Sequence, residues 1–529
     1  MVWQQGHFQY FRSVHFAMPI SLYIDPSITI GLQQQIYTEI RTATLTGRFP
    51  PRMRLTSSRA LASSLGVARM TVTEAYARLI SEGYLETRPG SGTFICSVLP
   101  EQSLVVSHSG LPVTPRTTKR QASLNTSASA SISLSKYGCA LQAAPSEDPR
   151  RPRSVIRMDQ TGPCIASFPV SQWSRVLLRQ ARNLVRDQFE YARDARGYQP
   201  LREAISQYLK RVRSVDCDPN RVVLVSGSQQ ALDICARILL DANDTVAVEM
   251  PCYPAAAQVF ASQGARMVHI PVDGAGIDCD ALFEQGAELC KATKTPIKLV
   301  YVTPSHQFPT GASLSLARRL ALLQWAFDNK VLILEDDFDS EYRYAGRPLP
   351  SLQGLIPNAP VIYIGTFSRT LFPGLRIGYA VLPEKLVGVF SQAKLLTDRQ
   401  GTTIDQCALT DFLNEGHLER HILRMRKLYG RRRAILVEAL TVQFGDRVRI
   451  GGDEAGMHVF AQFSLRIPET TAVHRALVAG VQAGRVHWAK DSARSRSVAF
   501  YFGFAALSEP AIREGVRRFA IALGAHPKN

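Results

Sequence analysis

Five short β-rich segments, separated by helical stretches and followed by polar or glycine-containing turns, constrain the fold of this chain most. They span residues 222–225, 245–248, 299–302, 331–334 and 361–364 and are rich in Val, Ile and Leu. Apolar runs without alternation are typical of strands buried on both faces, as in a largely parallel sheet covered by helices. The sequence therefore predicts an α/β body from about residue 158 onward, with functional groups at the carboxyl ends of its strands.

Side chains that can contact a small ligand follow these segments. After the first segment, Ser226 to Gln230 form a small-residue turn that leads into a helix. Backbone N–H groups at such a helix start can hold a phosphate. The other candidates after the second, third and fourth segments are Tyr253, His306, Gln307, Asp336 and Asp337.

The turn after the last segment reads Gly-Thr-Phe-Ser-Arg-Thr-Leu-Phe-Pro-Gly-Leu-Arg-Ile-Gly-Tyr over residues 365–379. It resembles the signature around the cofactor lysine of fold-type-I pyridoxal-phosphate (PLP) enzymes, where a lysine amine forms a Schiff base with PLP. Arg369 occupies the lysine position. A guanidinium stays protonated and delocalised, so it is not a usable imine-forming nucleophile. The segment therefore predicts the frame of an aminotransferase without its chemistry.

A second motif lies ahead of the body, between residues 28 and 97. Apolar residues at helical spacing predict three helices, the third of which is expected to bury Ile80 among other residues. The helices are expected over about residues 31–46, 56–65 and 69–82, and short strands over 84–87 and 93–95. Helices followed by a hairpin in this order predict a winged helix-turn-helix.

This segment resembles the GntR-type DNA-binding domain in S-S-R-A-L-A-x-x-L-G-V and in E-G-Y-L-E-x-R-x-G-S-G-T-F. In that family the second of the paired helices enters the major groove, and the wing contacts the minor groove or the backbone. The resemblance implies that Arg59 contacts phosphate and that Arg69 and Thr71 face the groove. It also implies that Arg88 and Gly92 form the wing tip. Arginine suits this work because its fork pairs bidentately with phosphate or guanine.

Two positions depart from the GntR pattern at the start of the third helix. Ala68 stands where a serine that caps the helix is common. The missing cap lowers the stability of the helix by about 1 kcal/mol. Met70 replaces an amide that could read a base edge. These changes leave the operator sequence open and the fold unaffected.

The two motifs together resemble the MocR/GabR-type transcription regulators, which join a GntR-type winged helix to a fold-type-I PLP domain through a linker. The resemblance implies an N-terminal winged helix-turn-helix and a large aminotransferase-like α/β domain with a mostly parallel sheet and a smaller C-terminal α+β subdomain. The expected parts are an N-terminal extension (1–27), the DNA-binding domain (28–97), a flexible basic linker (98–157) and the aminotransferase-like domain (158–529).

Taken residue by residue, the resemblance implies a cofactor site that has lost its reactive groups. The residues that match the phosphate cup are Gly227, Ser228, Gln229, Thr366, Ser368 and Arg376, and those that match the ring site are Tyr253, His306, Gln307 and Asp336. Asp336 matches the acid that pairs with the pyridine nitrogen. Arg369 and Phe338 stand where the family has the lysine and a tyrosine. The charge of Arg369 can then pair with the ligand phosphate or phenolate, or with Asp336 if the site is empty. The usual substrate-carboxylate arginine is absent, although Arg494 and Arg496 lie nearby in the sequence.

These observations predict a sequence-specific DNA-binding transcription regulator with a degenerate aminotransferase-like effector and dimerisation domain, without catalytic residues or a metal. The expected partners are double-stranded operator DNA, a second copy of the chain, and PLP or a related phosphate ligand bound noncovalently and not as an internal aldimine. Two alternatives stay open. One is an active PLP-dependent aminotransferase fused to a DNA-binding domain and rescued by Lys385 or Lys394; the other is a regulator whose body serves only as a dimerisation scaffold.

Charge and composition agree with a DNA-binding protein of the cytoplasm. The net charge of +18 and the pI near 9.7 favour a polyanionic partner. The sequence contains no run of about 18 apolar residues, so no membrane span is expected. The nine scattered cysteines, an odd number, favour reduced thiols over a disulfide framework.

Overall fold

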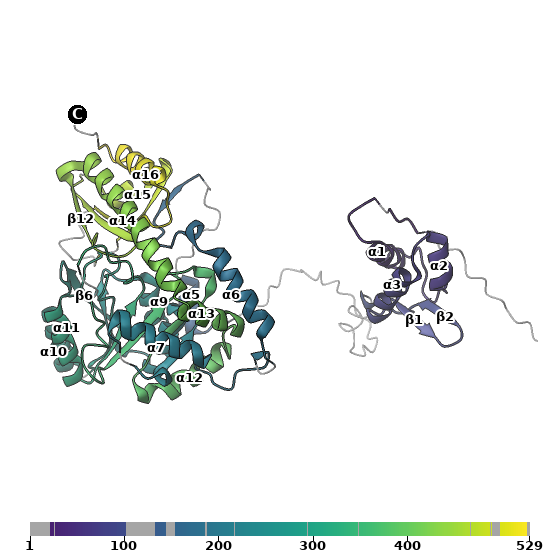
Figure 1. The fold of residues 1–529 in the computed structure, drawn as a ribbon, viewed down its shortest axis with the longest axis horizontal. Coiled ribbons are helices and arrows are strands. Elements are labelled where there is room, and N and C mark those ends of the chain that lie inside the picture. The colour runs from purple at the N-terminus through teal and green to yellow at the C-terminus, as the bar shows by residue number, and fades with distance from the viewer. Residues whose placement is uncertain are drawn as a thin grey trace, which may run out of the picture. The chain divides into compact units, whose positions relative to one another are not determined.

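The computed structural model describes residues 22–101, 133–143 and 154–525, except residues 26, 186–187, 216, 294, 347–348, 466, 487 and 489–497. The chain divides into two compact units, Met1–Ala130 and Ser131–Asn529 (Figure 1). Most of the expected N-terminal extension and linker lies outside the described residues.

The N-terminal unit consists of three helices and a hairpin. The helices are α1 (Leu32–Leu45), α2 (Ser58–Leu65) and α3 (Arg69–Ser81), followed by the antiparallel strands β1 (Leu85–Arg88) and β2 (Gly92–Ile95). The side chain of Ser57 caps α2 by accepting a hydrogen bond from the Ala60 backbone N–H at 3.3 Å. Ala68 gives α3 no such cap. The expected winged helix-turn-helix is confirmed.

One face of α3 supplies much of the core of this unit. Val72, Ala75, Tyr76 and Leu79 are buried at helical spacing. The expectation that Ile80 is buried is wrong, because its side chain is 37% exposed. Position 80 lies beyond the edge of the stripe that the other four residues define.

The body contains an eight-stranded sheet in the order β4-β11-β10-β9-β8-β5-β6-β7. The parallel strands are β4 (Val222–Val225), β5 (Thr245–Met250), β6 (Arg266–Asp273), β8 (Ile297–Val302), β9 (Leu332–Asp337) and β10 (Val361–Thr366). β7 (Gly276–Ile277) and β11 (Gly378–Val381) run antiparallel to their neighbours. The expected mostly parallel sheet is confirmed. Strand β6 was not predicted because it is only partly buried, so its sequence lacks a continuous apolar run.

Helices cover both faces of this sheet. α8 (Ser228–Leu239), α9 (Pro254–Ser262) and α12 (Glu384–Asp398) pack on one face, and α10 (Cys279–Thr293) and α11 (Leu316–Asp328) pack on the other. Successive strand residues point to opposite faces, so Leu334 lies in the first layer and Ile333 in the second. The same alternation decides where the acidic residues at the end of β9 point.

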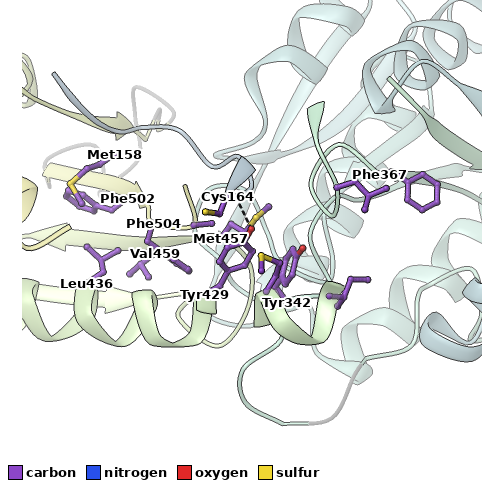
Figure 2. Packing of buried hydrophobic residues seen from close by; sticks show 14 of the residues in the cluster. Met158, Cys164, Tyr342, Phe367, Tyr429, Leu436, Met457, Val459, Phe502 and Phe504 are labelled. Atoms are coloured by element: carbon purple, nitrogen blue, oxygen red, sulfur yellow. Dashed lines mark hydrogen bonds between the residues drawn. The ribbon is translucent and has the colours of Figure 1, made fainter. Parts of the chain in front are cut away.

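A smaller sheet forms the C-terminal subdomain, in the order β12-β13-β15-β14-β3. Its strands are β12 (Val448–Gly451), β13 (His458–Phe463), β15 (Val498–Gly503), β14 (Val481–Arg485) and β3 (Ile156–Met158), and its helices are α14 (His417–Phe444), α15 (Glu469–Val478) and α16 (Glu509–Ala522). Figure 2 shows the core that joins α14 to this sheet, where the Cys164 backbone N–H donates to the Tyr429 hydroxyl at 2.9 Å. The expected α+β subdomain is confirmed.

The helices α6 (Val170–Asn183), α7 (Gln199–Arg213) and α13 (Thr403–Asn414) complete the core at the β4 end of the large sheet. Two further elements lie wholly or partly inside the range expected to be linker. Helix α5 (Lys136–Ala143) contacts α9, and β3 pairs in parallel with β14. Composition does not reveal these elements because each is short. None of the helices that the structure describes combines the length and apolar character needed to cross a bilayer.

Candidate functional site

A cavity of about 290 Å³ lies at the carboxyl ends of β4, β9 and β10. Nine of the eleven residues predicted to contact a ligand line it: Gly227, Ser228, Gln229, Tyr253, Asp336, Thr366, Ser368, Arg369 and Arg376. Five further residues line it: Phe338, which the sequence places at the position of the family tyrosine, and Gly162, Tyr301, Phe308 and Pro373, which were not predicted. Tyr301 lies inside an apolar strand, and Gly162 comes from a segment far away in the sequence, so neither carried a local signal.

One end of the cavity is formed by the start of α8. Gly227 precedes this helix with φ +93°, and no side chain caps the helix. A Cβ at Gly227 would lie 3.2 Å from the Arg376 guanidinium, so glycine suits both the backbone conformation and the close approach. Arg376 in turn donates to the Ser226 carbonyl. An uncapped helix start beside a guanidinium favours an anionic group such as phosphate.

Two hydroxyl groups from the β10 turn add to this end. Thr366 is the last residue of β10, and its Oγ1 accepts from the Ser368 backbone N–H at 3.2 Å. The Oγ of Ser368 is buried and has no hydrogen-bond partner among the described residues. These groups and the α8 start together can surround the oxygens of a phosphate.

Asp336 lies in the cavity wall as a buried acid, with 3% of its surface exposed. Its Oδ2 accepts from the Tyr301 hydroxyl at 3.0 Å, and its Oδ1 has no partner among the described residues. Burial raises the pKa of Asp336 to about 7, against the opposing effects of the Tyr301 hydrogen bond and the Arg369 charge. An orphaned buried acceptor is energetically unfavourable, and a protonated ring nitrogen would satisfy it.

Asp337, the next residue, points away from this cavity. Its Oδ2 lies 2.7 Å from Arg213 Nε and accepts from the Tyr363 hydroxyl at 2.6 Å and from Ser340 Oγ at 2.9 Å. Both side chains of the ion pair are buried, at 6% exposed for Arg213 and 2% for Asp337. Strand alternation therefore separates a structural acid from an acid that faces the cavity.

Arg369 reaches the cavity from the turn after β10. Its Nη1 donates to Thr161 Oγ1 at 2.7 Å and to the Thr161 carbonyl. Its guanidinium carbon lies 5.8 Å from the centroid of the Phe338 ring. Arg369 forms no ion pair with Asp336 or with any other carboxylate in the described part of the chain. The cavity thus contains a cation that is held in position by hydrogen bonds to Thr161.

His306 and Gln307 lie behind the cavity wall and do not line it. His306 is 2% exposed, with Nδ1 3.1 Å from Asp339 Oδ1. Gln307 is fully buried and donates to the Pro251 carbonyl at 2.6 Å. The side chain of Phe308, next along the chain, takes the wall position instead. Sequence position after β8 placed these residues near the cavity, and packing turned them inward.

No lysine lines the cavity in the part of the chain that the structure describes. Lys394 is 2% exposed on α12, with Nζ 2.8 Å from Asp398 Oδ1. Lys385 is exposed in the first turn of the same helix. Arg494 and Arg496 lie outside the described residues.

The residues predicted to contact DNA lie on α2, α3 and the hairpin of the N-terminal unit. Arg59 and Arg69 are exposed and have no carboxylate partner among the described residues, and Thr71 is half-buried. Met70 is 67% exposed at the start of α3. Arg88 differs, because its Nη2 lies 2.5 Å from Glu86 Oε1.

The hairpin tip contains one basic residue that was not predicted. Arg88 and Gly92 are register partners that close the hairpin, and Gly92 has φ +113°. A Cβ at Gly92 would lie 3.1 Å from Arg54 Nε, so the Arg54 side chain lies against the tip. Arg54 precedes α2 in a segment without a recognisable motif. A bridge to Phe94, together with the backbone hydrogen bond that the Leu55 N–H donates to the Thr93 carbonyl, places it at the hairpin.

Comparison with known proteins identifies the class of each unit. Residues 32–95 match the family described as "Bacterial regulatory proteins, gntR family", and residues 172–516 match "Aminotransferase class I and II". The fold and the cavity therefore define a GntR-type DNA-binding domain joined to an aminotransferase class I and II domain.

Whole-chain similarity narrows this class. The probable rhizopine catabolism regulatory protein MocR of Rhizobium meliloti is 34% identical over 498 residues, which cover 94% of each chain. The HTH-type transcriptional regulator TauR of Rhodobacter capsulatus is 31% identical over 528 residues, covering 96% of this chain and 100% of TauR. A crystal structure of Pyrococcus horikoshii kynurenine aminotransferase in complex with PMP matches with a TM-score of 0.65 and 29% identity, covering 74% of this chain and 95% of that one. The chain belongs to the MocR-type family of DNA-binding transcription regulators.

Proposed function

We propose that the body of this regulator binds PLP, or a related phosphorylated pyridine, noncovalently and does not catalyse transamination. The observation that carries the proposal is the pair of unpartnered buried oxygens, Asp336 Oδ1 and Ser368 Oγ, in a cavity that also contains the α8 start and Arg376. A phosphorylated pyridine supplies a partner for each of these groups. In an enzyme, bound PLP would act as an electron sink.

The residues that line the cavity can hold a pyridine ring, but the side chains that would react with the cofactor are absent from it. Tyr253 and Phe308 supply aromatic surface, and Asp336 holds the ring nitrogen. Arg369 has no usable amine, and Phe338 has no hydroxyl to donate to a ring oxygen. The active-aminotransferase alternative needs a lysine in the cavity, and Lys385 and Lys394 lie elsewhere on α12.

Titration of the full-length protein with pyridoxal phosphate tests this proposal. We expect binding without any adduct that borohydride can trap, and Arg376→Gln should weaken it by about 1.5–3 kcal/mol, the range for a hydrogen bond to a charged group. Arg59→Gln changes another exposed arginine, in the other unit, so it is the matched control and should leave the affinity unchanged. A reducible adduct in the wild type, or normal affinity in Arg376→Gln, would contradict the proposal.

We also propose that the protein acts as a cytoplasmic homodimer. Three apolar side chains near the end of α6 are exposed in the single chain: Val185 (60%), Phe189 (73%) and Tyr191 (73%). Large apolar side chains left exposed within one short segment favour coverage by a partner. Two copies would present two DNA-binding units to paired half-sites.

In the N-terminal unit we propose that α3 enters the major groove. Arg69 and Thr71 would then read bases, Arg59 would contact phosphate, and Arg88 with Gly92 would form the wing tip. The exposure of Arg59 and Arg69 without carboxylate partners supports this assignment. The surface pair of Arg88 with Glu86 contributes at most about 1 kcal/mol, so a phosphate can replace it.

A further inference from the structure

The cavity offers two cations and one acid to a phosphorylated pyridine. Arg376 lies beside the α8 start, and Arg369 lies beside Thr161 and Gly162. Asp336 is the one acid that lines the cavity within the described residues. With the phosphate at Arg376 and the protonated ring nitrogen at Asp336, the ring 3-oxygen is the one anion that pyridoxal phosphate leaves for Arg369, and its 4-aldehyde supplies none.

Arg369 is held in place with donors to spare. Both of its hydrogen bonds in the described part of the chain come from Nη1, and both go to Thr161. The Phe338 ring packs near the guanidinium and offers no hydroxyl to it. A guanidinium carries five N–H donors, so Nη2 and Nε stay available. A preorganised cation of this kind loses little conformational entropy when it binds an anion.

From this arrangement we infer that the ligand carries a carboxylate on the ring substituent that faces Arg369. The inference rests on the proposed function and narrows its ligand to one chemical class. A carboxylate pairs with a guanidinium through charge-assisted, often bidentate hydrogen bonds. An aldehyde or alcohol at the same position offers the guanidinium only a neutral oxygen, which is a weaker hydrogen-bond acceptor. An ammonium group there would be repelled by the guanidinium. Arg369 therefore selects acidic phosphorylated pyridines over their aldehyde, alcohol and amine forms.

Two kinds of molecule supply this shared chemistry. The carboxylate can be attached directly to the ring, as in 4-pyridoxic acid 5'-phosphate. It can also belong to an amino acid joined through its amine, as in N-(5'-phosphopyridoxyl)-L-leucine, which occupies a Thermus thermophilus aminotransferase of similar fold. Both molecules carry the phosphate, the pyridine ring and the acid.

Isothermal titration of the full-length protein with two matched pairs of probes tests the inference. One pair is 4-pyridoxic acid 5'-phosphate and pyridoxine 5'-phosphate. The other is N-(5'-phosphopyridoxyl)-L-leucine and N-(5'-phosphopyridoxyl)-3-methylbutylamine, which lacks only the carboxylate. We expect the acid to bind about tenfold to a hundredfold more tightly in at least one pair, and that pair identifies the source of the carboxylate.

Arg369→Met should abolish this preference, because the charge-assisted contact that separates each acid from its matched probe is lost. The wild-type comparison stands even if the variant folds poorly. Equal affinities within both pairs, or a preference that survives in Arg369→Met, would overturn the inference alone. Failure of all four probes to bind would overturn the proposed ligand site as well, so the two failures are distinguishable.

Discussion

Asp336→Asn should stabilise the ligand-free body at alkaline pH while it removes the partner of the ring nitrogen. Asp336 is almost fully buried, and one of its oxygens has no partner among the described residues. Asparagine keeps an oxygen for the Tyr301 hydroxyl and removes the charge. A group whose folded pKa is raised contributes stability at low pH that is lost as the pH rises through the folded pKa. The wild type should therefore lose stability, relative to the variant, between about pH 4 and pH 7.

The size of this effect follows from the two pKa values. The pKa of Asp336 rises from 3.8, its ordinary value, to about 7. Each pH unit of difference is worth about 1.4 kcal/mol, so the gap between variant and wild type should grow from under about 1 kcal/mol at pH 4 to about 4 kcal/mol at pH 8. The neighbouring charges are present in both proteins, and their interaction with the Asp336 carboxylate is already part of its raised pKa: Glu249, Asp337, Asp339 and Arg369.

Thermal unfolding of the body, followed from pH 4 to pH 8 without ligand, measures this gap. At pH 8 the variant should melt roughly 5 °C above the wild type. Asp337→Asn is the matched control, because it changes the same residue type one position along β9. It breaks the buried pair with Arg213 and should destabilise the body by about 3–5 kcal/mol.

Two results would refute the reasoning about Asp336. One is an Asp336→Asn variant that is as destabilised at pH 8 as Asp337→Asn. The other is a difference in melting temperature that stays constant with pH, which would show that Asp336 does not titrate as an isolated buried acid. Asp336→Asn should also lose ligand binding, because the carboxylate that binds the ring nitrogen is the group that lowers the stability of the ligand-free protein.

Three further predictions concern DNA, assembly and Arg369. Arg69→Ala should weaken binding to the specific operator by about 1–3 kcal/mol in gel-shift titration, whereas Arg59→Ala should weaken specific and nonspecific binding alike. Unchanged operator binding by Arg69→Ala would show that α3 is not the helix that reads the major groove. Sedimentation at micromolar concentration should give a homodimer without ligand, and Tyr191→Glu should shift it toward monomer; a monomeric wild type would exclude paired-site binding through the body. Arg369→Lys should make the protein yellow with pyridoxal phosphate and yield a borohydride-stable adduct at residue 369, because the cavity otherwise keeps its lining; no adduct at excess pyridoxal phosphate would mean that the cavity no longer accepts the cofactor.

Much of the fold could be predicted because buried strands and amphipathic helices leave local patterns. The apolar runs placed β4, β8 and β10 to within two residues, and the GntR motif placed α2, α3 and the hairpin. The half-exposed strand β6 and the short elements α5 and β3 leave weak patterns, so they were missed. Ile80 was assigned to the core because residue type alone does not show where a buried stripe ends.

The sequence by itself determined the order of the elements and the absence of a lysine amine at position 369, since no packing can give a guanidinium that reactivity. Tertiary structure alone decided how the side chains are used. It turned Asp336 toward the cavity and Asp337 toward Arg213, and it buried His306 beside Asp339. It also set Arg369 against Thr161, 208 residues away along the chain. Such choices depend on contacts between distant segments, and local residue patterns carry no record of them.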